Sequence, residues 1–595
     1  MAERIVSPGV FTRERDLSFL PQAIGEIGAA IVGPTEKGPA FTPTIVRTFA
    51  EYEEMFGSTS KSFYTPYAVQ QYLRSAGTVT IVRVLGIGGY VVDYVNLQLS
   101  SSLGLKTVAT LAPSRGGGAT NDLAATTSGS NGDWSSWDLV VSGSNTTAFS
   151  KTISFDTSSA DYIEKVLSSD SQVQKSGTTT APVYLYKNFK SHTSHKVYTN
   201  SDSGQALVSA SVSIGDGTFD FTSGVQTFDA DGNANSWTGN SSYSVARTPY
   251  IQSQLISGGR YDLFRVYTRS HGSDMNGNYK VCILNMKAAS AVAGSDYGTF
   301  SLQVRRHNPG GLDNDNVVEQ FDSLTFDPES SNYFARQIGS RFVEIDSNGK
   351  LTYKGDWPNM SKHIRVGDFN YLESFPKTVV PMGHEEVTNP ILGTASQVPT
   401  ASFIRRQNNA QGSFDANVFY GYNFSSTAYD NQQYLAPIPY NAGSGNNISM
   451  SLEDMYGNDN ATDLGGSTYA GTSTQLSLTN SHIRQRKFVV PFQWGFDGTN
   501  PATAKSTAND ISATNTQGFD CSSTAASGTV SYKRAINAVS NPDEFDINLL
   551  VLPGIIHEYH PKVTNHAIEK SEDRGDCFYV MDGSRWGRSI TNAVD

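Results

Sequence analysis

The apolar positions near the start of the chain follow first a strand pattern and then a helix pattern. Ile27–Val32 is a short apolar run that stops at Gly33-Pro34, which predicts a strand entering a turn. Apolar residues then recur at helical spacing. Thr48 and Glu51 stand three residues apart at the start of this stretch, which is the spacing of a capping box. We therefore expect a strand followed by a helix that begins at Thr48 and ends at Gly57.

A second helix and a second strand follow directly. Thr65-Pro66 places a proline at the first helical position, and the apolar face that follows it ends at Gly77. Val79–Leu85 is a β-branched run with Arg83 inside it. Strand, helix, helix and strand in this order predict an α/β module whose parallel strands are joined by a right-handed crossover.

The middle of the chain has a different texture. Residues 97–365 are rich in Ser, Thr, Gly, Asn and Asp with short alternating apolar stretches, which is typical of β-meanders and sandwich strands joined by polar turns. Because loop tips tolerate inserted domains, this block predicts insertions into the first module. Residues 366–520 are mixed and loop-rich. The stretches expected to be strands are Trp137–Val141, Val183–Tyr186, Val208–Ile214, Leu263–Thr268, Tyr279–Asn285, Tyr297–Val304 and Lys487–Phe492.

An α/β texture returns over residues 532–582. Phe545–Leu552 is a largely apolar run that Pro553-Gly554 should break. His557–Ser571 has a helical apolar face, and Cys577–Met581 is another short apolar strand. This order predicts a βαβ unit whose strands are buried on both faces. One more helix or strand would normally cover such a sheet, whereas the sequence given stops soon afterwards, at Asp595.

Composition and charge narrow the class of protein. The 595 residues suffice for several domains, and a hydrophobic fraction of 38% with 29 Tyr and 30 Phe argues against disorder. Only 17% of the residues are charged and the net charge is −12, so general nucleic-acid binding, which needs basic patches, is a poor fit. Residues 1–30 lack a signal-peptide pattern, and the longest apolar stretch, residues 547–556, is half a membrane span at most. We expect a soluble chain without membrane insertion.

Cysteine usage points to a reducing compartment. The three cysteines, Cys282, Cys521 and Cys577, lie far apart and in odd number. They make neither a disulfide framework nor a zinc-type spacing, so we expect buried free thiols.

Local motifs for catalysis, cofactors or metals are weak. Residues 86–89 (Gly-Ile-Gly-Gly) lack the third glycine and the helix of a dinucleotide loop, so we interpret them as a turn. A zincin motif has two histidines four residues apart, with a glutamate directly after the first. The sequence resembles it at His557, Glu558 and His560, but these histidines are only three residues apart. Residues 229–240 begin like a calcium loop but lack its glycine and its final acid. With no nucleophile elbow in the sequence, we expect no enzyme activity, no cofactor and no metal.

Several short blocks stand in a defined order along nearly the whole chain. The early ones are Ser7-Pro8-Gly9-Val10, Ala29–Gly33, Lys37-Gly38-Pro39, Met55-Phe56-Gly57 and Val79–Val84. The later ones are Leu263–Tyr279, Tyr297–Arg305, Val317–Gly339, Tyr434–Pro439, Arg486–Gly498 and Asn541–Gly583. Taken together, these blocks resemble the contractile tail sheath proteins of myovirus-type bacteriophages. Any one block alone would be weak, and residues 97–250 match poorly.

The resemblance implies a multidomain α+β fold. An α/β inner core domain would be formed from the N- and C-terminal segments, with β-rich sandwich or meander domains inserted as outer domains. The expected parts are a linking arm (1–20), an α/β sheath module (21–96), a Ser/Thr/Gly-rich protruding insertion (97–250), a second β-rich insertion (251–365), a middle domain (366–520) and the start of a C-terminal α/β domain (521–595). Family members run on beyond the last strand to a C-terminal arm.

The resemblance also implies a function. A sheath is a helical homo-oligomer around a tail tube protein, bounded by baseplate and tail terminator or neck proteins, and it contracts to drive the tube through the host envelope. It is assembled in the host cytoplasm, resides in the virion and uses no cofactor. The arm would add to a neighbour's sheet through Ile5, Val6, Pro8, Gly9, Val10 and Phe11. The alternative from sequence alone is a frayed terminus.

We further expect the α/β parts to face the tube and the Ser/Thr-rich insertions to face outward. Basic residues such as Lys533, Arg534 and Arg574 are candidates to meet an acidic tube, with ordinary surface charge as the alternative. Two other classes of protein compete with the sheath. A β-rich adhesin should carry an export signal, and a virion polysaccharide depolymerase should show β-helix coils or a paired-carboxylate cleft.

Overall fold

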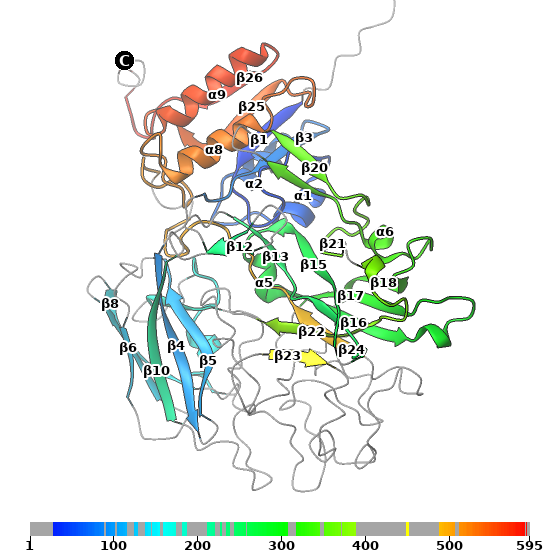
Figure 1. Cartoon of the computed structure of the whole chain (residues 1–595). Helices are drawn as coiled ribbons and strands as arrows, with labels where there is room; N and C mark the ends of the chain where they lie inside the picture. The colour runs from blue at the N-terminus through cyan, green and yellow to red at the C-terminus, as the bar shows by residue number, and fades with distance from the viewer. Residues whose placement is uncertain are drawn as a thin grey trace, which may run out of the picture.

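The computed structural model groups the described elements into three parts (Figure 1). An α/β unit lies at the top of Figure 1, a large antiparallel sheet at the lower left and a pair of packed sheets at the lower right. The structure describes residues 28–87, 91–101, 104–115, 124–128, 137–143, 146–154, 159–173, 181–186, 211–220, 226–228, 234–237, 243–257, 259–306, 317–345, 350–369, 372–387, 448–451, 487–505, 511–589 and 591. The chain is thus mixed α/β with several separate sheets, which confirms the expected fold class in its coarse form.

The α/β unit is a five-stranded sheet to which both ends of the described chain contribute. Its strand order is β2-β3-β1-β25-β26. The central strand β1 pairs in parallel with β3 on one side and with β25 on the other, and β26 pairs in parallel with β25. The bounds are β1 Ala29–Gly33, β2 Thr44–Val46, β3 Val79–Arg83, β25 Leu549–Ile556 and β26 Phe578–Asp582.

Helices cover the two faces of this sheet unequally. The helices α8 (Ser527–Asn537) and α9 (Pro561–Arg574) pack on one face, where the buried cluster reaches as far as Tyr579 of β26. The helices α1 (Phe49–Phe56) and α2 (Thr65–Tyr72) pack on the other face, over Ile31 and Ile81. Their cluster reaches Leu549 and Val551 of β25, which are only half-buried.

Both predicted helix starts are confirmed. The backbone N–H of Glu51 donates to Thr48 Oγ1 over 3.1 Å, as a capping box requires. The Glu51 carboxylate, however, accepts from the N–H of Arg47 rather than from that of Thr48, over 2.9 Å. The helix α2 has Pro66 in its first turn, and it ends at Tyr72, several residues before the predicted stop at Gly77.

Two predictions about the C-terminal strands were wrong. The strand β25 runs through Pro553-Gly554 instead of stopping there. Its ladder to β26 shifts register between Val551 and Ile556, so the missing proline N–H falls where the pairing is already interrupted. The strand β26 is not buried on both faces, because Phe578 is 70% and Val580 50% exposed. It lies at the edge of the sheet, next to β25 and away from β1 and β3, over which α1 and α2 pack.

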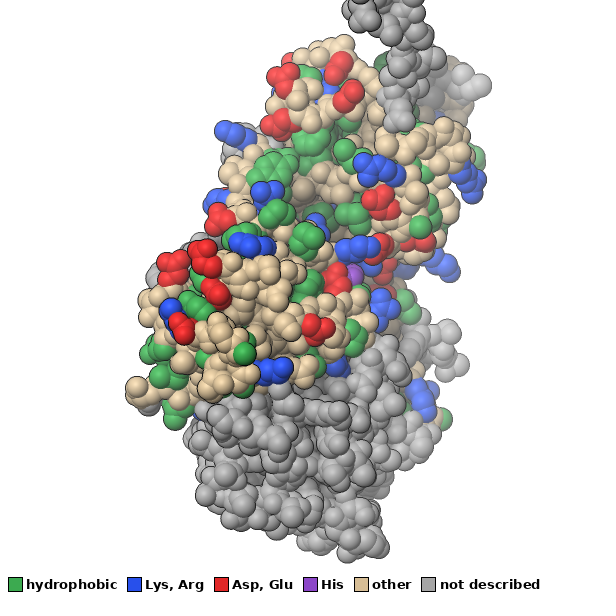
Figure 2. Space-filling model, turned by 90° about the vertical axis from the view of Figure 1, so that its right-hand side faces the viewer, with side chains coloured by type: hydrophobic (Ala, Val, Ile, Leu, Met, Phe, Trp, Pro, Cys, Tyr) green, Lys and Arg blue, Asp and Glu red, His purple; other side chains and the backbone are tan. Residues whose placement is uncertain are grey.

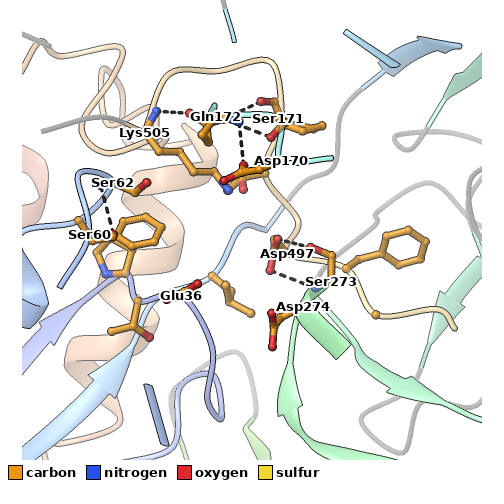
Figure 3. Close-up of a pocket in the computed structure, with 18 of the residues that line it drawn as sticks. Glu36, Ser60, Ser62, Asp170, Ser171, Gln172, Ser273, Asp274, Asp497 and Lys505 are labelled. Carbon is orange, nitrogen blue, oxygen red and sulfur yellow. Dashed lines mark hydrogen bonds between the residues drawn. The ribbon is translucent and has the colours of Figure 1, made fainter. Parts of the chain in front are cut away.

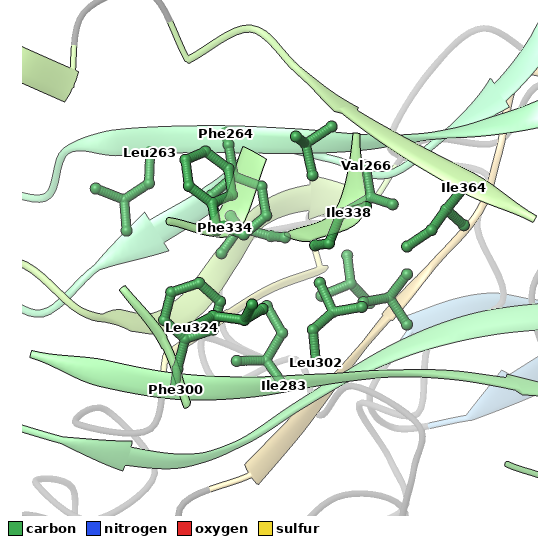
Figure 4. Close-up of a cluster of buried hydrophobic side chains, with 14 of the residues drawn as sticks. Leu263, Phe264, Val266, Ile283, Phe300, Leu302, Leu324, Phe334, Ile338 and Ile364 are labelled. Carbon is green, nitrogen blue, oxygen red and sulfur yellow. The ribbon is translucent and has the colours of Figure 1, made fainter. Parts of the chain in front are cut away.

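The pair of packed sheets encloses the largest buried cluster. Figure 4 shows Phe264 and Val266 from one sheet facing Phe300 and Leu302 from the other, with Phe334 of α6 (Phe334–Ile338) between them. One sheet contains β13 (Val245–Arg247), β14 (Ile251–Ser253), β15 (Asp262–His271), β21 (Ile364–Gly367), β22 (Pro381–Val387) and β23 (Ile448–Ser451). The other contains β16 (Tyr279–Lys287), β17 (Thr299–Arg306), β18 (Val317–Thr325) and β24 (Lys487–Pro491).

The antiparallel sheet at the lower left of Figure 1 and several smaller elements complete the described chain. A four-stranded sheet contains β4 (Val91–Ser101), β5 (Gly104–Pro113), β9 (Val183–Tyr186) and β10 (Ser211–Asp220). The strands β6 (Ala124–Ser128), β7 (Trp137–Gly143) and β8 (Thr146–Ile153) form a three-stranded meander. The remaining pairs are β11 (Gln226–Phe228) with β12 (Ala234–Trp237) and β19 (Phe342–Ile345) with β20 (Leu351–Lys354). The short helices are α3 (Ile163–Val166), α5 (Asp274–Asn278), η1 (Ala289–Ala291) and η3 (Leu372–Ser374).

Every stretch predicted as a strand in the middle of the chain overlaps a strand of the structure, from β7 to β24. The finer domain boundaries stay predictions. Residues on both sides of the expected boundaries at 250/251 and 365/366, such as Ala246 with Phe264 and Ile364 with Met382, belong to one buried cluster. The arm residues Ile5, Val6, Pro8, Gly9, Val10 and Phe11 lie outside the described residues.

Candidate assembly surface and unit junction

The outer edge of the α/β sheet carries an exposed apolar strip. Phe578 stands opposite Leu549 and Val580 opposite Val551, so all four side chains lie on one face of the sheet. Leu549 and Val551 are half-buried, whereas Phe578 is 70% and Val580 50% exposed. We call Phe578, Val580 and the outer side of β26 the β26 edge. Within the described residues, no strand pairs with its outer side.

Of the three basic residues that the sequence offered as tube contacts, Arg574 is used within the chain. Its guanidinium donates to the carbonyls of Val539 and Phe545 and pairs with Asp576 at 2.9 Å, and its side chain is 3% exposed. This is a correction, because a side chain so enclosed cannot meet a tube. It instead fastens the end of α9 to the segment that follows α8.

The other two basic residues lie half-buried on α8. Arg534 hydrogen-bonds the hydroxyl of Tyr243, and this bond opposes the larger effect of burial, which raises the pKa of Tyr243. Arg534 therefore joins α8 to a residue outside the α/β unit. Lys533 stays a prediction for a tube-facing charge.

The histidines of the weak zincin motif make hydrogen bonds within the chain, His557 through its Nδ1 to the hydroxyl of Thr564 and His560 to backbone groups. His560 is buried, and its Nδ1 accepts from the N–H of Ile556 while its Nε2 lies 3.1 Å from the carbonyl of Ser512. Burial lowers the pKa of His560, which keeps the ring neutral and suited to both contacts. Glu558 instead pairs with Arg585 and Arg588. Within the described residues, no group of three or more His, Cys, Asp or Glu is placed to hold a metal.

Arg83 at the end of β3 joins the α/β unit to the packed sheets. Its guanidinium donates to the carbonyls of Thr35, Glu36 and Gly38 in the loop after β1, over 3.2, 3.1 and 2.7 Å. It also donates to the carbonyl of His271 at the end of β15, over 2.7 Å. The residue is 1% exposed. A planar group with five N–H donors can bridge four carbonyls in this way, which a lysine cannot.

Charge and close packing complete this contact, which we call the Arg83 junction. Asp497, after β24, lies 3.7 Å from the guanidinium. Burial lowers the pKa of Arg83, whereas Asp497 and Asp274 raise it. Next to this pair, Gly272 adopts φ +98°, and a Cβ there would stand 2.2 Å from Asp497 Oδ1. Only glycine therefore lets the chain pass so close to the carboxylate.

The neighbouring histidine is held neutral. His271 is packed beside Arg83, and its Nδ1 accepts from the N–H of Ala40 over 3.1 Å. Burial, followed by the charges of Arg83 and Arg365, lowers the pKa of His271 to about 3. A second contact between the units is the ion pair of Lys362 with Glu54 of α1, at 2.7 Å. The α/β unit thus touches the packed sheets through both buried and exposed polar contacts.

A polar cavity of about 450 Å³ opens beside the Arg83 junction. Figure 3 shows that Glu36, Asp170, Asp274 and Asp497 reach it from four different segments. Gln172 and Lys505 close one side, where the Lys505 N–H donates to Gln172 Oε1 over 2.9 Å. Burial raises the pKa of Asp274, against the hydrogen bond from Asn278 that lowers it. The cavity lies where the α/β unit, the four-stranded sheet and the packed sheets meet.

The described surface mixes charges of both signs. On the face drawn in Figure 2, lysine and arginine side chains are interspersed with aspartate and glutamate. None of the helices in the described part of the chain has the length and apolarity needed to cross a bilayer. Cys282 and Cys521 are buried free thiols, as predicted, and Cys577 is a half-buried one.

Comparison with known proteins gives distant similarities to solved structures. No protein-family model matches the chain, and no curated protein matches it. The chain is similar to a sheath tail protein from Desulfitobacterium hafniense at 15% identity and a TM-score of 0.12, over 29% of this chain and 38% of that one. It is similar to a sheath tail protein from Listeria innocua at 13% identity and a TM-score of 0.10, over 33% of this chain and 35% of that one. The matches thus span little more than a third of those structures, and at such TM-scores they carry no argument.

Sequence reasoning missed the Arg83 junction. The signal was an arginine at the end of an otherwise apolar strand, Val79–Arg83, because a buried charge requires partners. Its partners are backbone carbonyls and one carboxylate far away in sequence, which no local pattern reveals.

Proposed function

We propose that the chain is a structural subunit of a contractile phage tail sheath, located in the virion. The observation that carries the proposal is the exposed β26 edge, on a sheet to which both ends of the described chain contribute. An exposed strand edge beside apolar side chains is a template for another strand. The ordered sequence blocks that resemble sheath proteins point in the same direction.

In this proposal each subunit lends residues 1–20 to the β26 edge of a neighbour. The segment contains two short apolar pairs, Ile5-Val6 and Val10-Phe11, on either side of Pro8-Gly9. Backbone hydrogen bonds along the edge would supply adhesion, and contact with Phe578 and Val580 would fix the register. Because each subunit both gives and receives an arm, the contact is head-to-tail and builds an open helix.

Contraction would move whole units while the arms keep neighbours tethered. The energy is stored at assembly as a metastable arrangement, which the baseplate releases. The partners are further copies of the chain, the tail tube protein, and the baseplate and terminator or neck proteins. The α/β unit would face the tube, with Lys533 on α8 as a candidate contact, and the β-rich parts would face outward. Assembly would take place in the host cytoplasm.

Electron microscopy of the full-length chain tests this function. Negatively stained samples, with and without the tail tube protein, should contain hollow cylinders with a regular axial repeat. The samples should be tested at concentrations up to about the millimolar range, where even weak contacts assemble. The proposal would be contradicted if the chain stayed a monodisperse globular particle in both samples.

A further inference from the structure

The loop that contains Gly38 and Ala40 in the α/β unit lies against the end of β15 in the packed sheets. Three hydrogen bonds cross this contact. The N–H of Gly38 donates to Ser270 Oγ over 2.8 Å, and the N–H of His271 donates to the Gly38 carbonyl over 3.1 Å. The third bond runs from the N–H of Ala40 to Nδ1 of the His271 ring, over 3.1 Å. A titratable ring thus accepts a hydrogen bond across the contact between two units.

The bond from Ala40 requires the His271 ring to be neutral. A neutral imidazole has one N–H donor and one acceptor nitrogen, whereas both nitrogens are donors once the ring is protonated. Because Nδ1 accepts from Ala40, the proton of the neutral ring belongs on Nε2. A further proton can add only to Nδ1, where it would meet the Ala40 N–H and remove this hydrogen bond.

The surroundings of the ring also oppose its protonation. His271 is half-buried, and the Tyr243 ring meets it edge-on with the ring centres 5.3 Å apart. Burial, followed by the positive charges of Arg83 and Arg365, lowers the pKa of His271 from 6.5 to about 3. A proton on the ring would therefore add a third positive charge next to two guanidinium groups while removing an acceptor.

Other charged groups around the contact act on Arg83 and Tyr243 or are next to Gly38 in the sequence. These groups are Glu36, Lys37, Asp274, Asp497 and Arg534. Burial raises the pKa of Glu36 and of Asp274, so protonation of these two carboxyls stabilises the closed contact as the pH falls. Their effect is opposite in sign to that of His271. The contribution of His271 must therefore be measured against a chain in which residue 271 does not titrate.

We propose that His271 makes the contact between the α/β unit and the packed sheets sensitive to acid. The neutral ring holds the loop through Ala40, and a proton on Nδ1 releases it. Because the pKa of His271 is lowered in the closed contact, its stabilising contribution is fully present above pH 6.5 and is lost as the pH falls toward 3. This inference does not depend on the sheath proposal.

Hydrogen exchange of the full-length chain at two pH values tests the proposal. The readout is the protection factor of the Gly38 and Ala40 amides, in which the intrinsic pH dependence of exchange is divided out. His271→Asn offers a side-chain oxygen near the place of Nδ1 but takes up no proton. Between pH 7.5 and 5.5, protection should fall by a factor about ten times larger in the unmodified chain than in His271→Asn.

His566→Gln is the matched control. His566 lies on α9, its pKa is also lowered by burial, and its ring contacts Asn537 within the α/β unit. This variant should keep the full pH dependence at Gly38 and Ala40. The proposal would be overturned if the protection of these amides depended on pH equally in the unmodified chain and in His271→Asn.

NMR of the unmodified chain, labelled with nitrogen-15 at histidine, gives a test that needs no variant. The His271 signal can be assigned through its contact with the Ala40 amide proton. It should show a neutral ring with the proton on Nε2 down to pH 5.5 in the closed contact. A ring that took up a proton with a midpoint near the ordinary 6.5, while Gly38 and Ala40 stayed protected, would contradict the proposal.

Discussion

Arg83→Met should loosen the contact between the α/β unit and the packed sheets without unfolding either part. The substitution leaves four buried or partly buried carbonyls and the Asp497 carboxylate without their shared donor. Removing one member of a buried charged network typically costs about 3–5 kcal/mol. By hydrogen exchange, the amides of Ala40 and His271, which donate across this contact to the His271 ring and to the Gly38 carbonyl, should exchange at least about a hundredfold faster.

The control for this prediction is Arg74→Met, which removes an arginine that makes an exposed hydrogen bond to Gln71. Such a surface change should alter exchange at Ala40 and His271 by less than about threefold. Arg83→Lys should give an intermediate result, because a lysine keeps the charge but not the fork of donors. If Arg83→Met exchanged like the unmodified chain, the carbonyls would be satisfied in another way and Arg83 would not hold the junction.

Phe578→Ser combined with Val580→Ser should abolish cylinder formation while the subunit stays folded. Both side chains are at least half exposed in the single subunit, so their loss should change its stability by less than about 1 kcal/mol. If an arm covers them in the assembly, only the exposed part of each side chain is newly buried, so each would contribute about 1–2 kcal/mol to every contact. Together they should raise the concentration needed for assembly by about a hundredfold, as measured by light scattering and electron microscopy.

Tyr353→Ser is the matched control for the β26 edge. Tyr353 is an aromatic residue on β20 with an exposure of 68%, close to the 70% of Phe578. The substitution removes a similar apolar area from a different exposed strand, so assembly should be unaffected. Cylinders that form normally in the Phe578→Ser and Val580→Ser chain would show that the β26 edge is not an assembly surface.

Local patterns predicted the elements of the α/β unit because each has a local physical cause. The hydroxyl of Thr48 caps α1, Pro66 lies in the first turn of α2, a short apolar run forms β1 and a β-branched run forms β3. The same reasoning found the strands of the packed sheets, where apolar residues alternate. These signals involve residues close together in the sequence.

The rest depends on contacts between distant residues. The strand β25 continues through Pro553-Gly554 because its pairing with β26 already shifts register there. This shift is a property of the two paired strands, so the sequence of β25 alone does not reveal it. The exposure of Phe578 follows from where α1 and α2 end on the sheet. Arg574 looked like a surface charge because its acceptors, the carbonyls of Val539 and Phe545, lie in another loop.

Disulfide trapping between two differently marked chains tests strand donation most directly. In a Cys577→Ser background, one chain carries Val10→Cys and a second, longer tagged chain carries Met581→Cys on the β26 edge. Strand donation predicts that oxidised assemblies of the mixture contain a disulfide-linked pair of the two chains, and that a single chain carrying both cysteines forms a ladder of linked oligomers. If the chain with both cysteines closed only onto itself, and the mixture gave no linked pair, the arm would fold back onto its own subunit and the account would be contradicted.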